Sequence, residues 1–473
     1  ICYHASFTPP DDKTVTSLFS SLPIKPELLA NIELLGYKEM TPIQAQGLPV
    51  LLEGEDLLAQ AKTGSGKTAA FGIGLLNKLE ALNYQTQSLV LCPTRELADQ
   101  VSNEIRRIAR AVPNTKILTL CGGKPMGAQV ASLERDPHIV VGTPGRILKH
   151  LLKGTLNLDN LNTLVLDEAD RMLDMGFLED IMLITDKMPR KRQTLLFSAT
   201  YPDEIRNISG MVQRNPIEVR VEISHHNQQI KQAFYQVQRD QKTAALVALL
   251  EHHSPESTLV FCNQKQTCKD LCDELWKHGF HACTLHGDLE QFDRDQVLVQ
   301  FANRSSSVLI ATDVAARGLD IKELAAVVNY ELTPDPEIHV HRIGRTGRAG
   351  NDGLALSLFY AGEQFRVDAI AKYQDSPANI ENLSSLSPRE NFKLSPPMTT
   401  LFINAGRKDK IRAGDILGAL TANTDLPGKR IGKIDIFDKI AYVAVECQVA
   451  KQALSILTEG KIKGRSFRAR ALR

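Results

Sequence analysis

The sequence lacks the features that mark membrane, disulfide-rich and strongly charged proteins. No run of 18 apolar residues occurs in its 473 residues, so we expect no membrane-spanning helix and no membrane partner. The eight cysteines form no C-x-x-C pair, which argues against a zinc site and favours reduced core thiols of a cytoplasmic protein. Aromatic residues make up only 5% of the chain, and the net charge is +1. A globular protein of two to four domains remains.

The small net charge hides an uneven distribution. Residues 394–473 carry 15 Lys and Arg against 7 Asp and Glu, a net charge of +8, whereas the rest of the chain carries −7. The last thirteen residues contain six basic side chains and no acidic one. A basic module attached to a mildly acidic body predicts a polyanionic partner for the C-terminal part.

Short apolar runs alternate with helix-like segments over most of the chain. The clearest strands of a first series are expected at 88–92, 138–141, 163–166 and 194–197. The alternation thins near 221–228 and then restarts, with strands expected at 258–262, 282–285, 307–311, 325–330 and 354–359. This βαβ pattern predicts an α/β fold class with parallel sheets, in domains covering 1–222 and 228–376.

The remaining segment has a different pattern. Residues 374–397 are rich in Ser, Pro, Asn and Glu, which is typical of a flexible tether. In 398–473 we expect strands at 400–403, 432–437, 440–445 and 466–471, and helices at 413–420 and 449–457. This βαββαβ order predicts a third, α+β ferredoxin-like domain, the arrangement that RNA-recognition modules share.

A phosphate-binding loop is expected between a strand at 56–60 and a helix-compatible run at 69–82. The loop is Ala61-Lys62-Thr63-Gly64-Ser65-Gly66-Lys67-Thr68. Small residues let backbone N–H groups close around a phosphate, and the helix N-terminus adds partial positive charge. Lys67 would reach the β- and γ-phosphates, and the Thr68 hydroxyl would bind Mg²⁺. Ala61 replaces the first glycine of the general pattern.

Acidic residues follow another apolar run, at 164–166. The tetrad Asp167-Glu168-Ala169-Asp170 would lie at the carboxyl end of a buried parallel strand, where α/β sheets bind their ligands. One carboxylate there can hold Mg²⁺ while its neighbour positions a water molecule. An isolated acidic tetrad is more often a solvated turn, but the Lys67 loop upstream favours a nucleotide site.

Polar clusters also follow other expected strands. They are 93–96, 143–146 and 198–200 in the first domain, and 263–264, 312–313 and 316–320 in the second. Any one of them could be a capped turn. Together they predict that the ligand-binding edge of each sheet is lined with polar and basic groups.

The ordered motifs of residues 1–376 resemble those of the DEAD-box RNA helicases. Phe19 stands 17 residues before Gly36, and Thr41-Pro42-Ile43-Gln44 follows, as in the adenine-recognising motif of that family. His341-Arg342-Ile343-Gly344-Arg345-Thr346-Gly347-Arg348 matches its arginine-finger motif. The resemblance implies two tandem RecA-like domains, the cofactors ATP and Mg²⁺, and RNA-stimulated ATP hydrolysis coupled to domain closure.

The resemblance also implies roles for individual residues. Phe19 and Gln44 would contact adenine, and Asp320 would approach the ribose. Residues Thr63 to Thr68 would hold the phosphates, Asp167 would hold Mg²⁺ through water, and Glu168 would orient the attacking water. Arg345 and Arg348 would be the arginine fingers. His341 would couple the domains by meeting Asp170, Ser198 and Thr200. The RNA backbone would be contacted by Pro93, Thr94, Arg95, Gly123, Thr143, Gly145, Arg146, Arg294 and Thr312.

The C-terminal segment resembles the corresponding domain of the bacterial DbpA-type DEAD-box proteins. Phe402 and Tyr442 are aromatic where stacking on RNA bases would be useful, but Ile440 and Val445 occupy the other usual stacking positions. RNA could instead be held by a basic rim, with Arg407, Lys408, Lys410, Lys429, Arg430 and Lys433 among its residues. The implied partners are single-stranded and duplex RNA, a hairpin of 23S-type rRNA and the large-subunit ribosomal precursor.

Three alternatives stay open at this point. The chain could be a DNA helicase with the same paired-sheet core, although Gln44 and the RNA-type tail argue against it. It could be an RNA clamp in which ATP only locks the grip, or its tail could bind a protein. We expect a monomer.

Overall fold

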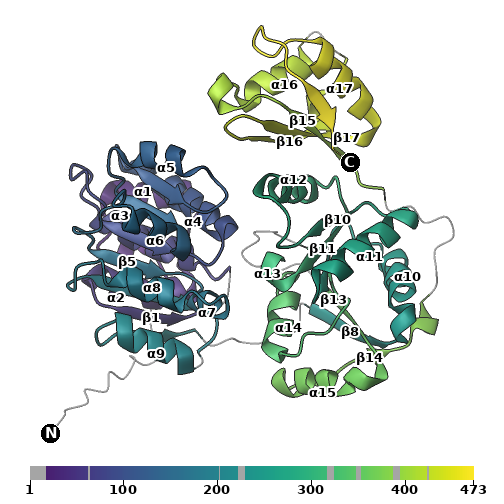
Figure 1. Cartoon of the computed structure of the whole chain (residues 1–473), viewed down its shortest axis with the longest axis horizontal. Coiled ribbons are helices and arrows are strands. Elements are labelled where there is room, and N and C mark those ends of the chain that lie inside the picture. The colour runs from purple at the N-terminus through teal and green to yellow at the C-terminus, as the bar shows by residue number, and fades with distance from the viewer. Residues whose placement is uncertain are drawn as a thin grey trace. The chain divides into compact units, whose positions relative to one another are not determined.

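The computed structural model describes residues 17–61, 64–201, 203–221, 230–316, 324–347, 353–386, 395–422 and 425–472 (Figure 1). Within these ranges, the search for a helix both long enough and apolar enough to span a bilayer gives none. The described strands form two seven-stranded sheets and one four-stranded sheet, each belonging to a successive part of the chain.

The first domain is built on a parallel sheet with the strand order β3-β4-β2-β5-β6-β1-β7. Its strands are β1 (Leu57–Gln60), β2 (Ser88–Leu91), β3 (Ile117–Leu120), β4 (Ile139–Gly142), β5 (Thr163–Leu166), β6 (Gln193–Ser198) and β7 (Ile217–Arg220). Its helices are α1 (Pro26–Leu34), α2 (Pro42–Glu53), α3 (Lys67–Lys78), α4 (Arg95–Ile108), α5 (Met126–Leu133), α6 (Pro144–Leu152), α7 (Ala169–Asp174), α8 (Leu178–Thr185) and α9 (Asp203–Val212).

Both faces of this sheet are buried, because the strand residues that point to each face are mainly apolar. Ala59, Val90 and Val165 belong to one core cluster, whereas their neighbours Leu58 and Leu91 belong to another. Side chains of consecutive strand residues point to opposite faces, so the two clusters are the two faces of one sheet. Helices cover each of them (Figure 1).

The second domain repeats this arrangement. Its sheet is also parallel and has the order β10-β11-β9-β12-β13-β8-β14. The strands are β8 (Ile230–Gln236), β9 (Thr258–Cys262), β10 (Ala282–Leu285), β11 (Val308–Thr312), β12 (Ala326–Asn329), β13 (Gly353–Phe359) and β14 (Ile380–Glu381). The helices are α10 (Lys242–His253), α11 (Lys265–Lys277), α12 (Gln291–Ala302), α13 (Asp313–Ala316), α14 (Pro336–Ile343) and α15 (Gln364–Tyr373).

The C-terminal domain is an antiparallel sheet with helices on one face. Its strands are β15 (Met398–Ile403), β16 (Ile431–Ile436), β17 (Ala441–Glu446) and β18 (Ala469–Ala471), in the order β16-β17-β15-β18. Helices α16 (Ala413–Thr421) and α17 (Ala450–Glu459) contribute to a core with the inward residues Leu401, Ile403 and Val443. The predicted ferredoxin-like order of elements is confirmed.

The other face of this sheet packs against α12 of the second domain, with which it shares one compact unit. Val299 of α12 forms a small apolar cluster with Tyr442 and Leu472. Beside it, the Thr400 hydroxyl accepts a hydrogen bond from Asn303 Nδ2 at 3.3 Å and lies 2.6 Å from Ser305 Oγ. The tail (residues 398–473) therefore packs on the second domain through the face of its sheet that lies opposite α16 and α17.

The fold class is confirmed, and the differences lie at the sheet margins. The sequence analysis placed no strand at β3, β7, β8 or β14. Because β14 pairs with β8 beyond residue 376, the second sheet continues into the segment that we expected to be a tether. For β7 and β14 the reason is exposure: only Val219 is buried in β7, and β14 has no fully buried residue.

Candidate active site and RNA interface

The phosphate loop leads from β1 into α3 as expected. Gly64 and Gly66 have φ values of 84° and 97°, a left-handed conformation that favours glycine. Lys67 opens α3 and is 5% exposed. Neither its Nζ nor the Ser65 hydroxyl has a hydrogen-bond partner among the residues that the structure describes. A buried ammonium whose N–H groups lack hydrogen-bond acceptors is costly, so this loop fits an anionic ligand such as a phosphate.

Gln44 is tied to this loop. Its Oε1 accepts a hydrogen bond from the Thr41 backbone N–H at 2.9 Å, and its Nε2 donates to the Gly66 carbonyl at 3.1 Å. A Cβ on Gly66 would lie 2.6 Å from that Nε2, and the φ of 97° would strain any other residue, so glycine is favoured there. The expected adenine reader therefore also fixes the entry to α3.

The acidic tetrad follows β5, the strand between β2 and β6. Asp167 and Glu168 are 2% and 6% exposed. Burial raises the pKa of the Asp167 carboxyl to about 6, against the opposing charge of Lys67. Its Oδ1 has no hydrogen-bond partner within the described ranges. A carboxylate buried beside an ammonium, with one oxygen free of such bonds, suits a divalent cation next to phosphate.

Glu168 adopts a strained backbone conformation. Its φ of 52° is uncommon for a residue other than glycine, and it turns the chain from β5 directly into α7. Such strain is typical of functional sites. The structure thus places two buried carboxylates in succession at the carboxyl edge of the sheet.

Asp170 links this strand to the next one. Its Oδ2 accepts hydrogen bonds from the backbone N–H groups of Ala199 and Thr200 and from the Thr200 hydroxyl, each at 3.1 Å. The Ser198 hydroxyl is buried and has no partner among the described residues. Three of the four expected domain-coupling residues thus lie at adjacent strand ends.

The expected RNA-contact residues of the first domain gather at the other half of the same edge, after β2, β3 and β4. Thr94 caps α4 by accepting a hydrogen bond from the Leu97 N–H at 3.2 Å. A Cβ on Gly122 would lie 3.0 Å from an Arg95 guanidinium nitrogen, so Arg95 reaches the β3 end. Arg146 donates to Gln129 Oε1 at 2.8 Å and to the Lys124 carbonyl at 3.0 Å.

The strand order explains this division. Strands β3, β4 and β2 are neighbours and carry the expected RNA residues Pro93, Thr94, Arg95, Gly123, Thr143, Gly145 and Arg146 at their ends. Strands β5, β6 and β1 are neighbours and carry the expected nucleotide residues. The expected RNA and nucleotide sites are therefore adjacent along one sheet edge.

The second domain contains a buried arginine that the sequence analysis did not single out. Arg342 is 2% exposed and donates from Nε and Nη2 to the two carboxylate oxygens of Asp313, each at 2.7 Å. It also donates to the side-chain oxygens of Asn329 and Asn263, at 3.2 and 2.9 Å, and to the Glu331 carbonyl at 2.7 Å. Arg342 therefore joins the ends of β9, β11 and β12 to α14.

This network positions the neighbouring candidates. His341 precedes Arg342 in α14, and Arg345 follows in the turn after it, where its N–H donates to the Arg342 carbonyl at 3.2 Å. Thr312 ends β11, and Arg294 lies in α12, where it donates to the His286 carbonyl at 3.4 Å. Thr63, Asp320 and Arg348 lie outside the described residues.

Phe402 and Tyr442, the expected stacking residues of the tail, face α12. Tyr442 is fully buried, and the Phe402 ring lies 5.7 Å from it and 6.4 Å from the ring of Phe292 in α12. Arg470 lies over Phe402 at 5.0 Å. These rings serve domain packing here, and their stacking on RNA stays a prediction.

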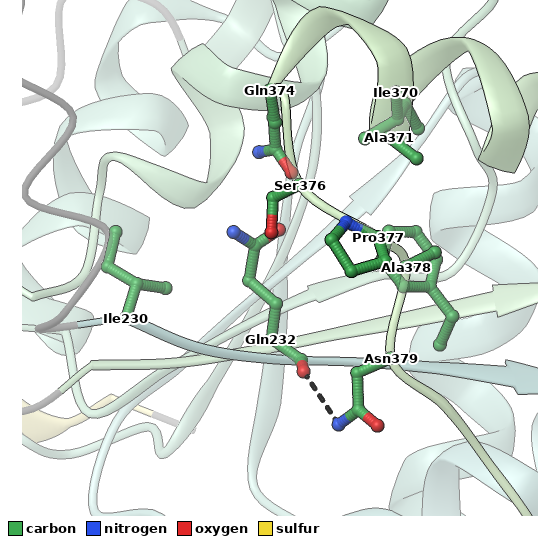
Figure 2. A pocket seen from close by; sticks show the side chains of 10 residues that line it. Ile230, Gln232, Ile370, Ala371, Gln374, Ser376, Pro377, Ala378 and Asn379 are labelled. Carbon is green, nitrogen blue, oxygen red and sulfur yellow. Dashed lines mark hydrogen bonds between the residues drawn. The ribbon is translucent and has the colours of Figure 1, made fainter.

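A pocket of about 150 Å³ in the second domain is separate from the candidate site. It lies where β8 meets α15 and the chain leading to β14, as Figure 2 shows. Asn379 Nδ2 donates to the Gln232 carbonyl at 3.2 Å across one side of it. None of the described site residues lines it.

Family comparisons agree with this geometry. Residues 41–208 match the DEAD/DEAH box helicase family, 241–350 match the helicase conserved C-terminal domain, and 400–471 match the DbpA RNA binding domain. The chain is 54% identical over 463 residues to the ATP-dependent RNA helicase DbpA of Escherichia coli, covering 96% of this chain and 99% of that one. It is 37% identical over 473 residues to the Bacillus subtilis protein of the same name, covering 96% and 98%.

Solved structures show the same paired domains. The Saccharomyces cerevisiae protein Dbp5 bound to RNA and ADP BeF3 superimposes with a TM-score of 0.72 at 30% identity, covering 78% of this chain and 96% of that one. Both parallel-sheet domains are thus RecA-like, as expected. The chain belongs to the DEAD/DEAH box helicase family, and its two helicase domains are followed by an RNA-binding domain of the DbpA type.

Proposed function

We propose that this protein is an ATP-dependent RNA helicase that separates or remodels RNA locally, acting in the cytoplasm on large-subunit ribosomal RNA during ribosome assembly. Its relatives are named as ATP-dependent RNA helicases. The observation that carries the proposal is the pair of buried groups, Lys67 Nζ and Asp167 Oδ1, that lack hydrogen-bond partners within the described ranges at one sheet edge.

These residues fit ATP with Mg²⁺. Backbone N–H groups of the loop around Gly64 to Gly66 and the Lys67 ammonium would hold the phosphates, and Thr68 and Asp167 would hold the metal. When bound, Mg²⁺ neutralises charge on the phosphate oxygens. Phe19 and Gln44 would hold the adenine.

Hydrolysis requires groups from both domains. Glu168 orients a water molecule and accepts its proton, while the guanidinium groups of Arg345 and Arg348 stabilise the charge that develops on the γ-phosphate oxygens. Because Glu168 belongs to the first domain and the arginines to the second, turnover depends on closure of the two. Asp170, Ser198, Thr200 and His341 would relay this closure.

RNA would favour the same closed state. Contacts from Arg95, Arg146, Arg294 and Thr312 to phosphate and ribose groups carry no sequence information, so the helicase domains would bind RNA of any sequence. Because ATP and RNA both favour closure, each should raise the affinity for the other.

The tail would provide the choice of RNA. Its sheet face is packed on α12, so we assign rRNA binding chiefly to the basic rim, where Arg407, Lys408 and Lys410 are exposed and Lys463 donates to the Lys410 carbonyl at 3.1 Å. A hairpin held there would keep the helicase domains near one part of the large-subunit precursor.

Glu168→Gln tests the enzymatic part of the proposal. The variant keeps size and polarity but cannot accept a proton, so RNA-stimulated ATP turnover should fall by about 10²–10⁴-fold while ATP binding persists. Glu179→Gln, at an exposed position in α8, is the matched control. Unchanged turnover in Glu168→Gln would contradict the assigned base. Wild-type protein that binds ATP and RNA without turnover would indicate a clamp instead.

Rim and ring variants test the tail. Lys408→Gln with Lys410→Gln should weaken binding to a large-subunit rRNA hairpin and reduce the magnitude of the log–log salt slope by about one per lost phosphate contact. Lys451→Gln, exposed in α17, is the control. A larger loss of affinity in Phe402→Ala than in the rim variants would contradict the rim as the main RNA contact.

A further inference from the structure

The segment 17–40, which precedes the adenine-recognising motif, contacts the C-terminal ends of helices α3 and α4. We refer to it as the clasp segment. Its own ends are joined by a hydrogen bond of 2.6 Å from the Met40 N–H to the Ser17 carbonyl. Between them lie Phe19 and the short helix α1.

The clasp segment holds the C-terminal end of α3. The Lys25 N–H donates to Asn77 Oδ1 at 2.8 Å, and Asn77 Nδ2 donates back to the Pro23 carbonyl at 3.1 Å. Lys25 Nζ donates to the Leu79 carbonyl at 3.0 Å. The N-terminus of this same helix is Lys67 of the phosphate loop.

The segment also holds the C-terminal end of α4. Asn31 Nδ2 donates to the Ile108 carbonyl at 2.8 Å. Tyr37 Oη donates to Glu104 and accepts from Arg107 Nη2 at 2.7 Å, and Arg107 pairs with Glu104 at 2.8 Å. Burial, followed by the hydrogen bond to Glu104, raises the pKa of Tyr37 to about 12. The N-terminus of α4 carries Thr94 and Arg95.

Tyr37 connects this polar cluster to the adenine side of the site. Its ring meets the ring of Phe19 edge-on, with centroids 6.3 Å apart, and the Arg107 guanidinium lies 5.5 Å from the Tyr37 ring. Phe19 is 3% exposed and has no polar atom in its side chain, so packing alone sets its position. Gly36 turns the chain into Tyr37 with a φ of 86°.

We infer that Tyr37, Glu104 and Arg107 are positioning residues that hold Phe19 in place for adenine and fasten it to α4, the helix that begins at the RNA-contact residues. This inference rests on the proposed role of Phe19 in ATP binding. The Tyr37 hydroxyl fixes the ring that Phe19 packs against, so its loss loosens the adenine contact without touching Lys67, Asp167 or Glu168.

Tyr37→Phe is the critical variant. It keeps the ring and leaves the Arg107–Glu104 ion pair in place, so the fold is retained. The KM for ATP should rise about threefold to tenfold, the effect of one lost hydrogen bond, with kcat at saturating ATP and RNA unchanged. Tyr84→Phe, in the same domain and 60% exposed, should leave both constants unchanged.

Phe19→Ala separates this inference from the proposed function. A raised KM in both Phe19→Ala and Tyr37→Phe supports the positioning role. A raised KM in Phe19→Ala with a wild-type KM in Tyr37→Phe overturns it and leaves the adenine role of Phe19 intact. An unchanged KM in Phe19→Ala overturns that adenine role itself. A Tyr37→Phe protein that loses thermal stability and kcat together, with no change in KM, shows a structural role only and also overturns the inference.

Discussion

The two parallel-sheet domains have the same strand order but opposite chemistry at their carboxyl edges. Renumbered within each domain, both sheets have the order 3-4-2-5-6-1-7. In the first domain this edge presents Lys67 and Asp167, both buried and with polar atoms that lack hydrogen-bond partners among the described residues. In the second, the buried charge is Arg342, which is paired with Asp313 and hydrogen-bonded to three further residues.

This difference shows what a shared scaffold leaves free to change. Strand order and apolar strand interiors fix where the loops meet, whereas the loop residues decide whether the edge is completed by a ligand or by the protein itself. The first edge is built to receive a ligand. At the second edge, Arg342 is held by groups of the protein itself, next to the turn that carries Arg345.

The largest expected effect tests whether the second edge takes part in catalysis. Arg345→Ala should lower RNA-stimulated ATP turnover by about 10³–10⁵-fold, because the γ-phosphate would lose one of its two proposed guanidinium partners. Steady-state ATPase assays measure this, and Arg304→Ala, 64% exposed in its side chain, is the control. A loss of ATP turnover below tenfold would indicate that the second domain serves only as a scaffold.

The next effect tests the hydrogen-bond network around Arg342. Arg342→Met leaves the Asp313 carboxylate without its guanidinium partner and should destabilise the second domain by about 3–5 kcal/mol. Trp276, the one tryptophan of the chain, lies in α11 and reports urea unfolding of this domain. Arg304→Met should change stability by under about 1 kcal/mol, since its ion pair with Glu256 is exposed. Equal effects of the two variants would show that the network adds no stability.

A smaller effect concerns acid sensitivity. His339 stacks on Phe234 with ring centroids 5.7 Å apart, and both its nitrogens lack partners within the described ranges. Burial, aided by the Arg342 charge, lowers the pKa of His339 to about 3. The unfolded chain therefore binds a proton below pH 6.5 that the folded domain does not, and stability falls as pH drops from 6.5 toward 3.

His339→Phe removes this proton linkage and keeps the stacked ring. Compared with wild type, the variant should retain about 2 kcal/mol more stability on going from pH 7 to pH 5. Urea unfolding followed through Trp276 at both pH values measures the difference. Parallel losses in the two proteins would show that another group causes the acid sensitivity.

Sequence patterns predicted the sheet interiors and missed their margins. Strands such as β2 and β5 are buried on both faces and therefore read as continuous apolar runs. Strands β7 and β14 lie at sheet edges, where exposed positions tolerate polar residues and the apolar run disappears. The same reasoning placed the phosphate loop and the acidic tetrad at one sheet edge, because the carboxyl ends of parallel strands converge there whatever the loops contain.

Two features of the site could not be predicted from the sequence and are evident only in the three-dimensional structure. Arg342 is one of three arginines in its motif, and only the convergence of Asn263, Asp313 and Asn329 from separate strand ends distinguishes it. Phe402 has the aromatic character of an RNA-stacking residue, and the sequence does not indicate that α12 already covers it. The local sequence indicates which interactions a side chain can make, whereas the partners of that side chain come from distant parts of the chain.

The packing of the tail on α12 sets the distance between the tail and the rest of the second domain. Helix α12 bears the tail through Val299 and the residues that follow it, and the expected RNA contact Arg294 lies on the same helix. Under the proposed function, an rRNA hairpin bound to the tail would stand at a set span from the RNA gripped by the second domain. Such a protein would select its substrate by geometry: the RNA duplex to be opened must lie at that distance from the hairpin, whatever its sequence.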